Sequence, residues 1–293
     1  MVPIMETSKQ HVAVIGASGM LGSAVTRYFF RESEFSITGT VRSKDSIGLF
    51  PESLQDNLVW GVDVNNFNSV HDFIKEHQPD VVINCVGLVK QLSDANDPLI
   101  ALPINSLFPH MLARCCAEHG ARVIHMSTDC VFSGSKGGYL DDEIPDAHDL
   151  YGVSKRLGEV DYPNAVTLRT SIIGHELNGN SSLIDWFLSQ EGSVKGFSKA
   201  IFSGLPTVEI ARIIRDYVIP NKELRGLYHV SADPINKYDL LSLVADIYGH
   251  NTRIIKDADF KIDRSLDSSR FRAVTGFNPA PWHEMIITMK NFG

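Results

Sequence analysis

A short apolar run followed at once by three regularly spaced glycines lies near the start of the chain. His11-Val-Ala-Val-Ile15 has the apolar, β-branched character of a buried parallel strand, and Gly16-x-x-Gly19-x-x-Gly22 comes directly after it. Apolar residues at helical spacing continue from Ala24. This order predicts a strand, a tight turn and a helix that together bind a nucleotide, because free amides and a partial positive charge at a helix N-terminus attract phosphate.

The alternation of strands and helices continues through the first part of the chain. Further apolar runs typical of strands lie at 35–41, 58–62, 80–87, 122–126 and 165–170, and helices are expected at 68–77, from about 104 to 120, and from 151. This order predicts an α/β fold, a doubly wound parallel sheet of the Rossmann type. We expect residues 1–170 to form this domain, rejoined by parts of 203–232. Residues 171–293 would then form mainly a smaller, mixed α/β substrate-binding lobe.

Composition excludes several other classes of protein. The 293 residues are 43% hydrophobic and the net charge is −8, which favours a globular core and argues against nucleic-acid binding. No uninterrupted apolar run approaches the roughly 18–20 residues of a membrane span, and residues 1–10 lack a signal-peptide core. The four cysteines form no C-x-x-C pair, which fits reduced thiols. We expect a cytoplasmic protein with no membrane partner, and the histidine spacing predicts no metal site.

The glycine turn and the ends of the following strands supply the predicted cofactor site. Arg42 follows the second strand, where a carboxylate usually binds a free ribose 2′-hydroxyl. Arginine suits a 2′-phosphate, so NADPH is favoured over NADH, although an exposed cation is the alternative. Asp63 either reaches the adenine edge or caps the next helix. The predicted cofactor-binding residues are Gly16, Ser18, Gly19, Met20, Leu21, Arg42, Asp63, Val64, Cys85, Val86, Gly87, Tyr151 and Lys155.

A hydroxyl, a phenol and an ammonium are expected to converge at the carboxyl edge of the sheet. Thr128 ends the fifth predicted strand, where open α/β sheets bind ligands. Tyr151 and Lys155 are four residues apart and share a helical face, so we expect the lysine to lower the tyrosine pKa. Such a set could protonate a carbonyl oxygen while a hydride reaches its carbon. Thr128, Tyr151 and Lys155 are the predicted catalytic residues.

Candidate substrate residues are more widely scattered. Trp186 either packs against a ligand or belongs to the core of the lobe. Arginines 264, 270 and 272, among hydroxyls, either hold a diphosphate or form a solvated turn. The predicted substrate residues are Lys90, Thr128, Asp129, Cys130, Tyr151, Trp186 and Arg270.

These motifs together resemble the extended short-chain dehydrogenase/reductase superfamily. The resemblance rests on the glycine turn, Asn84 with Gly87, Asn105, Thr128 and Tyr151-x-x-x-Lys155. More narrowly, the chain is similar to the dTDP-4-dehydrorhamnose reductase family. The segments that carry this likeness are Ser127-Thr-Asp-x-Val-Phe-x-Gly134, Tyr151-Gly-x-Ser-Lys-x-x-Gly-Glu159 and Leu168-Arg-Thr-Ser171.

The resemblance implies an NAD(P)H-dependent reductase of a 4-keto-6-deoxy sugar nucleotide, in deoxysugar or surface-polysaccharide precursor synthesis. It implies that Tyr151 donates a proton to the C4 oxygen and that Lys155 tunes Tyr151 and holds the nicotinamide ribose. Thr128 would bond the carbonyl, and Asp129 would place the sugar. The family commonly has tyrosine where Cys130 stands, so the sugar or nucleotide is expected to differ, for example a UDP-linked or N-acetylated hexose.

Two other functions fit the same scaffold. One is a sugar-nucleotide epimerase that retains its NAD(P), and the other is a non-catalytic, nucleotide-binding regulatory subunit. By resemblance, helical faces near 104–119 and 150–160 would pair subunits in a homodimer.

Overall fold

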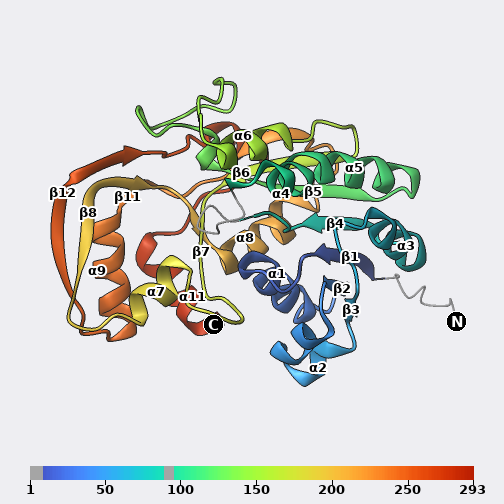
Figure 1. Cartoon of the computed structure of the whole chain (residues 1–293), viewed down its shortest axis with the longest axis horizontal. Coiled ribbons are helices and arrows are strands. Elements are labelled where there is room, and N and C mark those ends of the chain that lie inside the picture. The colour runs from blue at the N-terminus through green and yellow to red at the C-terminus, as the bar shows by residue number, and fades with distance from the viewer. Residues whose placement is uncertain (1–8, 89–95) are drawn as a thin grey trace, which may run out of the picture.

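A seven-stranded sheet forms the larger part of the molecule, a computed structural model that describes residues 9–88 and 96–293 (Figure 1). Every neighbouring pair of strands in it is parallel. In spatial order the strands are β10 (Gly226–His229), β6 (Ala165–Thr170), β5 (Arg122–Thr128), β4 (Val81–Asn84), β1 (Gln10–Ile15), β2 (Phe35–Val41) and β3 (Leu58–Trp60). The predicted doubly wound α/β fold is confirmed. Strand order reverses between β1 and β4, where such sheets open a ligand crevice.

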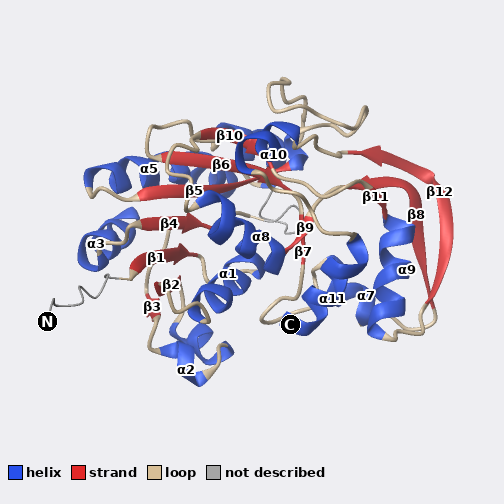
Figure 2. Ribbon diagram, turned by 180° about the vertical axis from the view of Figure 1, so that it is seen from behind, coloured by secondary structure: helices blue, strands red, loops and turns tan. Residues whose placement is uncertain are grey.

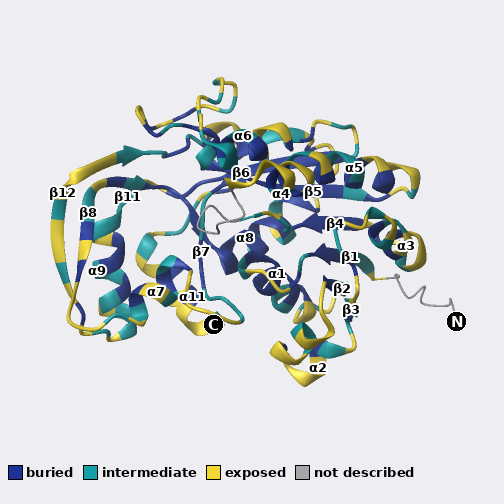
Figure 3. Cartoon of the chain, viewed as in Figure 1, coloured by how far each residue is buried: buried dark blue, intermediate teal, exposed yellow. Residues whose placement is uncertain are grey.

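Helices cover both faces of the sheet (Figure 2). The cluster on one face includes α1 (Met20–Phe30) and α8 (Thr207–Ile213), and that on the other includes α3 (Phe67–His77) and α5 (Phe108–Glu118). Shorter helices are α2 (Glu52–Gln55), α4 (Pro98–Ala101), α6 (Leu150–Leu157) and α10 (Ser269–Thr275). The central strands are buried along their length (Figure 3).

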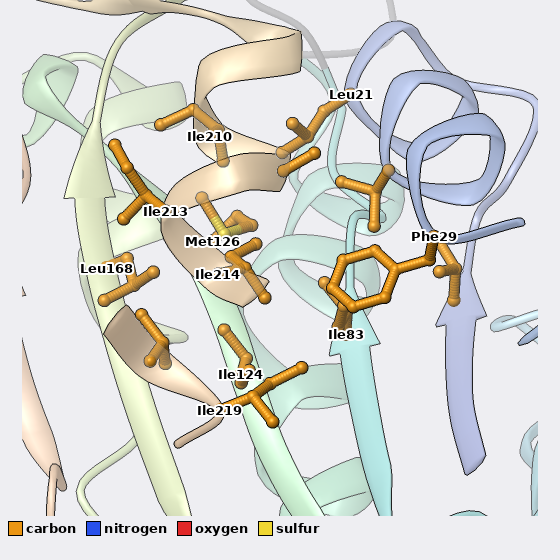
Figure 4. Close-up of a cluster of buried hydrophobic side chains, with 14 of the residues drawn as sticks. Leu21, Phe29, Ile83, Ile124, Met126, Leu168, Ile210, Ile213, Ile214 and Ile219 are labelled. Carbon is orange, nitrogen blue, oxygen red and sulfur yellow. The ribbon is translucent and has the colours of Figure 1, made fainter. Parts of the chain in front are cut away.

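The packing between α1, α8 and the sheet follows directly from the apolar pattern of the sequence. Leu21 and Phe29 of α1 and Ile210 of α8 lie over Ile83 and Ile124 of the strands (Figure 4). Fully burying one such side chain contributes about 1.5–3 kcal/mol, so this interface fixes the helix that follows the glycine turn.

Several predicted boundaries shift for local reasons. The third strand ends at Trp60, not at residue 62, because Gly61 has φ +85° and turns the chain away. The fourth is shorter than predicted and ends at Asn84, whose side-chain oxygen accepts the Val86 amide at 3.1 Å. The predicted helix from about 104 begins earlier, at Pro98, after Asp97 caps it through the Leu99 amide at 2.9 Å.

The helical stretch Pro98–Glu118 passes from α4 through a π-helical segment, Leu102–Leu107, into α5. Within the described residues, its 21 residues and mean hydropathy of 1.2 make it long and apolar enough to cross a membrane. The apolar runs of the sequence had predicted no segment of this kind, because polar residues interrupt the stretch. Half of its most apolar window is buried inside the molecule, and Phe108 and Leu112 pack in the core cluster beneath the sheet. A core helix passes the same test of length and composition.

A smaller unit stands beside the sheet on the side away from the N-terminus (Figures 1 and 2). Its three-stranded sheet has the order β11 (Ile235–Asn236), β8 (Ser193–Phe202) and β12 (Arg253–Asp263). The core beneath it includes residues of α7 (Leu183–Leu188), α9 (Lys237–Tyr248) and α11 (Trp282–Phe292). The strand pair β7 (Ile172–Ile173) and β9 (Leu205–Pro206) follows β6 and β8. Strand β12 was not predicted, because its residues are mostly charged or exposed.

Candidate active site

A cleft of about 800 Å³ lies where the carboxyl ends of the parallel strands meet the smaller lobe. The glycine turn, the residues that end β4, β5 and β6, and helix α6 form its sheet side. Residues of α7, β8, α9 and the end of β12 form its lobe side. The lobe therefore closes over the edge at which an open α/β sheet binds ligands.

The glycine turn has the backbone geometry that a phosphate-binding site needs. Gly16 has φ +85°, and a Cβ on Gly22 would clash with the Gly16 carbonyl and lie 3.0 Å from Ala17 Cα. Gly19 is the N-cap of α1 and has no side chain to occupy the free amides. Gly19, Met20 and Leu21 line the cleft, so these residues fit a bound pyrophosphate. Gly16 and Ser18 shape the turn without lining the cleft wall.

The residues predicted to bind the adenosine end of the cofactor do not line the cleft. Arg42 is exposed at the end of β2. Asp63 and Val64 are partly buried after β3. The alternative reading of Asp63 as a helix cap is wrong, because α3 starts after Asn66 and Asp63 Oδ1 instead accepts the Asn65 amide at 3.0 Å. The predicted roles of Arg42, Asp63 and Val64 in cofactor binding stay predictions.

The loop after β4 contributes three predicted cofactor residues to the cleft, Cys85, Val86 and Gly87. A Cβ placed on Gly87 would lie 3.5 Å from Lys155 Nζ, so the backbone runs close to helix α6. Burial raises the pKa of the Cys85 thiol to about 12, so it stays protonated and unreactive at neutral pH. Predicted substrate residue Lys90 lies outside the described residues.

The end of β5 forms a tight polar turn on the cleft wall. Thr128 Oγ1 donates to Asp129 Oδ1 at 3.2 Å and accepts the Cys130 amide at 3.1 Å. All three residues line the cleft. Burial raises the pKa of the Asp129 carboxyl, while the Arg264 guanidinium acts to lower it. A Cβ on Gly152 would clash with the Cys130 carbonyl, so α6 packs tightly against this turn.

Helix α6 brings Tyr151 and Lys155 to the same cleft. The helix begins where Asp149 Oδ1 accepts the Gly152 amide at 3.0 Å. Lys155 Nζ donates to the Met126 carbonyl oxygen at 2.8 Å, and burial lowers its pKa to about 8.

The prediction that Lys155 lowers the pKa of Tyr151 is wrong for this structure. Burial raises the pKa of the Tyr151 phenol, and the nearby Cys130 and Asp129 also act to raise it. Of the groups around it, the Thr128 hydroxyl acts in the opposite direction. The phenol therefore keeps its proton throughout the neutral range.

The lobe side of the cleft carries two cations, Lys237, which the sequence did not indicate, and Arg264, one of the three arginines expected to hold a diphosphate or to form a solvated turn. Lys237, the first residue of α9, lies with its Nζ 4.9 Å from the Phe202 ring centroid. Arg264, just past β12, donates through Nε to the Phe132 carbonyl oxygen at 2.7 Å. Both line the cleft, as does the predicted residue Trp186. The composition around Lys237 gave no signal, since a lysine at a helix start is usually a surface residue.

The choice of Arg270 as a substrate residue is corrected by the structure. Its guanidinium lies 4.5 Å from the Tyr228 ring and donates to the Leu227 carbonyl oxygen at 3.1 Å, at the outer edge of the sheet. Arg264, six residues earlier, takes the place in the cleft because β12 ends there.

Positive charge is concentrated in the cleft although the chain is acidic overall. Among its described lining residues, Lys155, Lys195, Lys237 and Arg264 are cationic, and Asp129 and Glu176 are carboxylates. The net charge of the chain is −8, so this excess of cations is local. Such a cleft favours anionic ligands. No cluster of three or more potential metal ligands lies within residues 9–88 and 96–293.

The fold is that of the extended short-chain dehydrogenases/reductases. Residues 10–291 match the family described as the RmlD substrate binding domain, and the chain belongs to that family. A solved structure of dTDP-4-dehydrorhamnose reductase from Bacillus anthracis, in complex with NADP, superposes with a TM-score of 0.78 at 20% identity. The superposition covers 97% of this chain and 99% of that one.

Three curated relatives extend the comparison. The probable low-salt glycan biosynthesis reductase Agl14 of Haloferax volcanii is 31% identical over 58% of this chain and 56% of its own length. A dTDP-4-dehydrorhamnose reductase of Streptomyces griseus is 31% identical over 50% of this chain and 42% of its own. Methionine adenosyltransferase 2 subunit beta of Xenopus laevis is 24% identical over 94% of this chain and 80% of its own length. The chain thus spans about half the length of the first two relatives.

Proposed function

We propose that this protein is an NADPH-dependent reductase acting on the C4 carbonyl of a 4-keto-6-deoxy sugar nucleotide. The observation that carries the proposal is the presence of Thr128, Tyr151 and Lys155 in the same cleft as the glycine turn. Membership of a family that includes sugar-nucleotide reductases supports it. A role in deoxysugar or surface-polysaccharide precursor synthesis is part of the proposal.

The cofactor would be held by the glycine turn, the loop after β4 and Lys155. The open amides at Gly19 suit its pyrophosphate, and the backbone at Gly87 lies beside Lys155 where a nicotinamide ribose would fit. A bound reduced nicotinamide supplies a hydride. The chain itself must hold the carbonyl and deliver the proton.

Tyr151 is the group that would deliver the proton. Its raised pKa means that the phenol is protonated before each turnover, as a general acid requires. Thr128 Oγ1 would bond the same carbonyl oxygen and so orient it toward the phenol. Lys155 would hold a positive charge beside the developing alkoxide and bind the ribose.

The lobe would bind the anionic part of the substrate. Lys237 and Arg264 suit a diphosphate, because charge-assisted bonds to phosphate are strong. Trp186 and Asp129 would contact the nucleotide or sugar, and Cys130 leaves room where the family commonly has tyrosine. Lys90 stays a predicted substrate residue.

Replacing Lys237 with glutamine is expected to weaken binding of dTDP or UDP by about 10- to 150-fold, since one charge-assisted bond contributes about 1.5–3 kcal/mol. NADPH binding should change little. Isothermal titration with each nucleotide measures both effects. Lys256→Gln is the matched control, because it removes the same charge from the same lobe outside the cleft wall. Equal affinity in Lys237→Gln and wild type would remove Lys237 from the substrate site.

Replacing Arg42 with alanine is expected to weaken NADPH binding about tenfold and NADH binding far less, because only NADPH has a 2′-phosphate. Cofactor fluorescence gives both dissociation constants. Arg225→Ala, which removes an exposed arginine paired with Glu223, is the control and should change neither. Equal losses for the two cofactors would overturn the assignment of the 2′-phosphate to Arg42.

Turnover tests the proposed function itself. Purified protein is mixed with NADPH or NADH and with dTDP- or UDP-linked 4-keto-6-deoxy sugars made in situ by their dehydratases. Oxidation of the cofactor with one substrate is the expected result. No oxidation with any plausible keto-sugar nucleotide would contradict the reductase proposal.

A second candidate is a non-catalytic regulatory subunit. It is favoured by the similarity to methionine adenosyltransferase 2 subunit beta over most of the chain. Retention of Tyr151 and Lys155 in the cleft counts against it. A stoichiometric partner enzyme captured without turnover would support this candidate.

An epimerase would instead retain tightly bound NAD(P) through purification. A cytoplasmic location and a homodimer remain predictions.

A further inference from the structure

Helix α6 and the residues just after it are tied to consecutive residues of β5. Lys155 Nζ donates to the Met126 carbonyl oxygen at 2.8 Å. Ser127 Oγ donates to Glu159 Oε1 at 2.7 Å. Lys155 and Glu159 are four residues apart, as are Tyr151 and Lys155. The two bonds therefore fix the catalytic helix against the strand immediately before Thr128.

Glu159 is itself locked by a buried arginine. Arg169 Nε donates to Glu159 Oε1 at 2.6 Å and its NH2 group donates to Oε2 at 2.7 Å. Only 5% of the Arg169 side chain and 10% of that of Glu159 are exposed. Arg169 lies directly across from Ser127 in the register of β5 and β6. The two parallel bonds from Arg169 thus hold the Glu159 carboxylate in one position, next to the residue that precedes Thr128.

Arg169 has two further contacts beyond Glu159. Its NH1 group donates to His229 Nε2 at 3.2 Å, and the guanidinium lies 5.3 Å from the Phe132 ring centroid. His229 Nδ1 donates to the Tyr139 carbonyl oxygen at 3.0 Å. Burial lowers the pKa of His229 to about 4, so the ring stays neutral and accepts from Arg169 at neutral pH. Arg169 is consequently fixed from β10 and from the connection before α6.

The groups around Lys155 leave it with little compensating charge. The Cys85 thiol beyond β4 stays protonated, and burial lowers the pKa of His125 on β5 well below its usual value, so this imidazole is neutral. The Tyr151 phenol, one turn earlier on α6, is also neutral. Of the two groups that act to raise the pKa of Lys155 against the effect of burial, Glu159 acts more strongly than Cys85. Arg169 partly offsets the charge of Glu159.

We propose that Glu159, held by Arg169, is a positioning residue that keeps Lys155 protonated and aligned at the end of β5. A purely structural ion pair would stabilise the fold without affecting the protonation of Lys155. The consequence for turnover rests on the proposed function, but the protonation of Lys155 does not, and it can be measured without any substrate.

The test is a pH titration of the lysine side chains by NMR, with carbon-13 at Cε. The signal missing in Lys155→Arg identifies Lys155, which is expected to titrate near pH 8. In Glu159→Gln its midpoint should fall by about half a pH unit or more, because the carboxylate is lost while the Arg169 cation remains. Glu209→Gln, which breaks another Glu–Arg pair with a 7% exposed glutamate on α8, should lower stability and leave the midpoint unchanged.

Removing one partner of a buried ion pair is strongly destabilising, so Glu159→Gln with Arg169→Met, which removes both charges, is titrated beside it. The Lys155 midpoint in this double variant should fall less than in Glu159→Gln, because the Arg169 cation that repels the Lys155 ammonium is also gone. An unchanged midpoint in these folded variants would overturn the proposal. If a substrate is found, the alkaline limb of the pH profile of kcat/KM should move to lower pH, more in Glu159→Gln than in the double variant. Absence of turnover would contradict the proposed function and leave the titration result intact.

Discussion

Replacing Tyr151 with phenylalanine is expected to lower turnover roughly 10²–10⁴-fold, the usual loss when a general acid is removed. The phenol lines the cleft beside Thr128, and its raised pKa keeps the transferable proton in place at neutral pH. Phenylalanine retains the ring and its packing, so the affinity for NADPH should stay close to that of the wild type. Stopped-flow NADPH oxidation and cofactor fluorescence measure the two quantities.

Tyr162→Phe is the matched control for this variant. Tyr162 lies shortly after α6, and its hydroxyl forms a hydrogen bond with His110 Nδ1 at 3.1 Å, outside the cleft lining. Removing that hydroxyl should leave turnover near the wild-type value. Unchanged turnover in Tyr151→Phe would exclude the phenol as the acid, and a parallel loss of NADPH affinity would indicate a structural role instead.

Replacing Gly22 with alanine is expected to abolish NADPH binding and to lower the free energy of unfolding by about 1–3 kcal/mol or more, as overpacking does. The new Cβ would clash with the Gly16 carbonyl, and it would lie 2.8 Å from Gly16 carbonyl carbon and 3.0 Å from Ala17 Cα. These are backbone atoms and cannot rotate away, so the turn that presents the α1 amides must distort. Urea denaturation and cofactor fluorescence report the two effects.

Gly48→Ala provides the comparison, because a Cβ there meets no atom within 4 Å. Its stability should stay within about 0.5 kcal/mol of the wild type, and NADPH affinity should be unchanged. If Gly22→Ala also bound NADPH normally, the close packing of α1 on the turn would not be needed for the cofactor site.

The sequence was informative wherever chemistry depends on residues close together in the chain. The strand, the glycine turn and α1 form one continuous segment, and Tyr151 and Lys155 share a face because a helix repeats every 3.6 residues. The buried parallel strands were visible as apolar runs, so the fold class was predicted correctly. The structure brings Thr128, Tyr151 and Lys155 to one cleft. Their roles in binding and catalysis remain to be measured.

Contacts between distant segments were decided only by the tertiary structure. Lys237 and Arg264 reach the cleft because α9 and β12 belong to a lobe that folds back over the sheet, and Arg270 lies away from it because β12 ends at Asp263. The environment of Tyr151 followed the same rule. Local spacing predicted a lowered pKa for Tyr151, but burial of the phenol raises it, and desolvation depends on everything packed around the group.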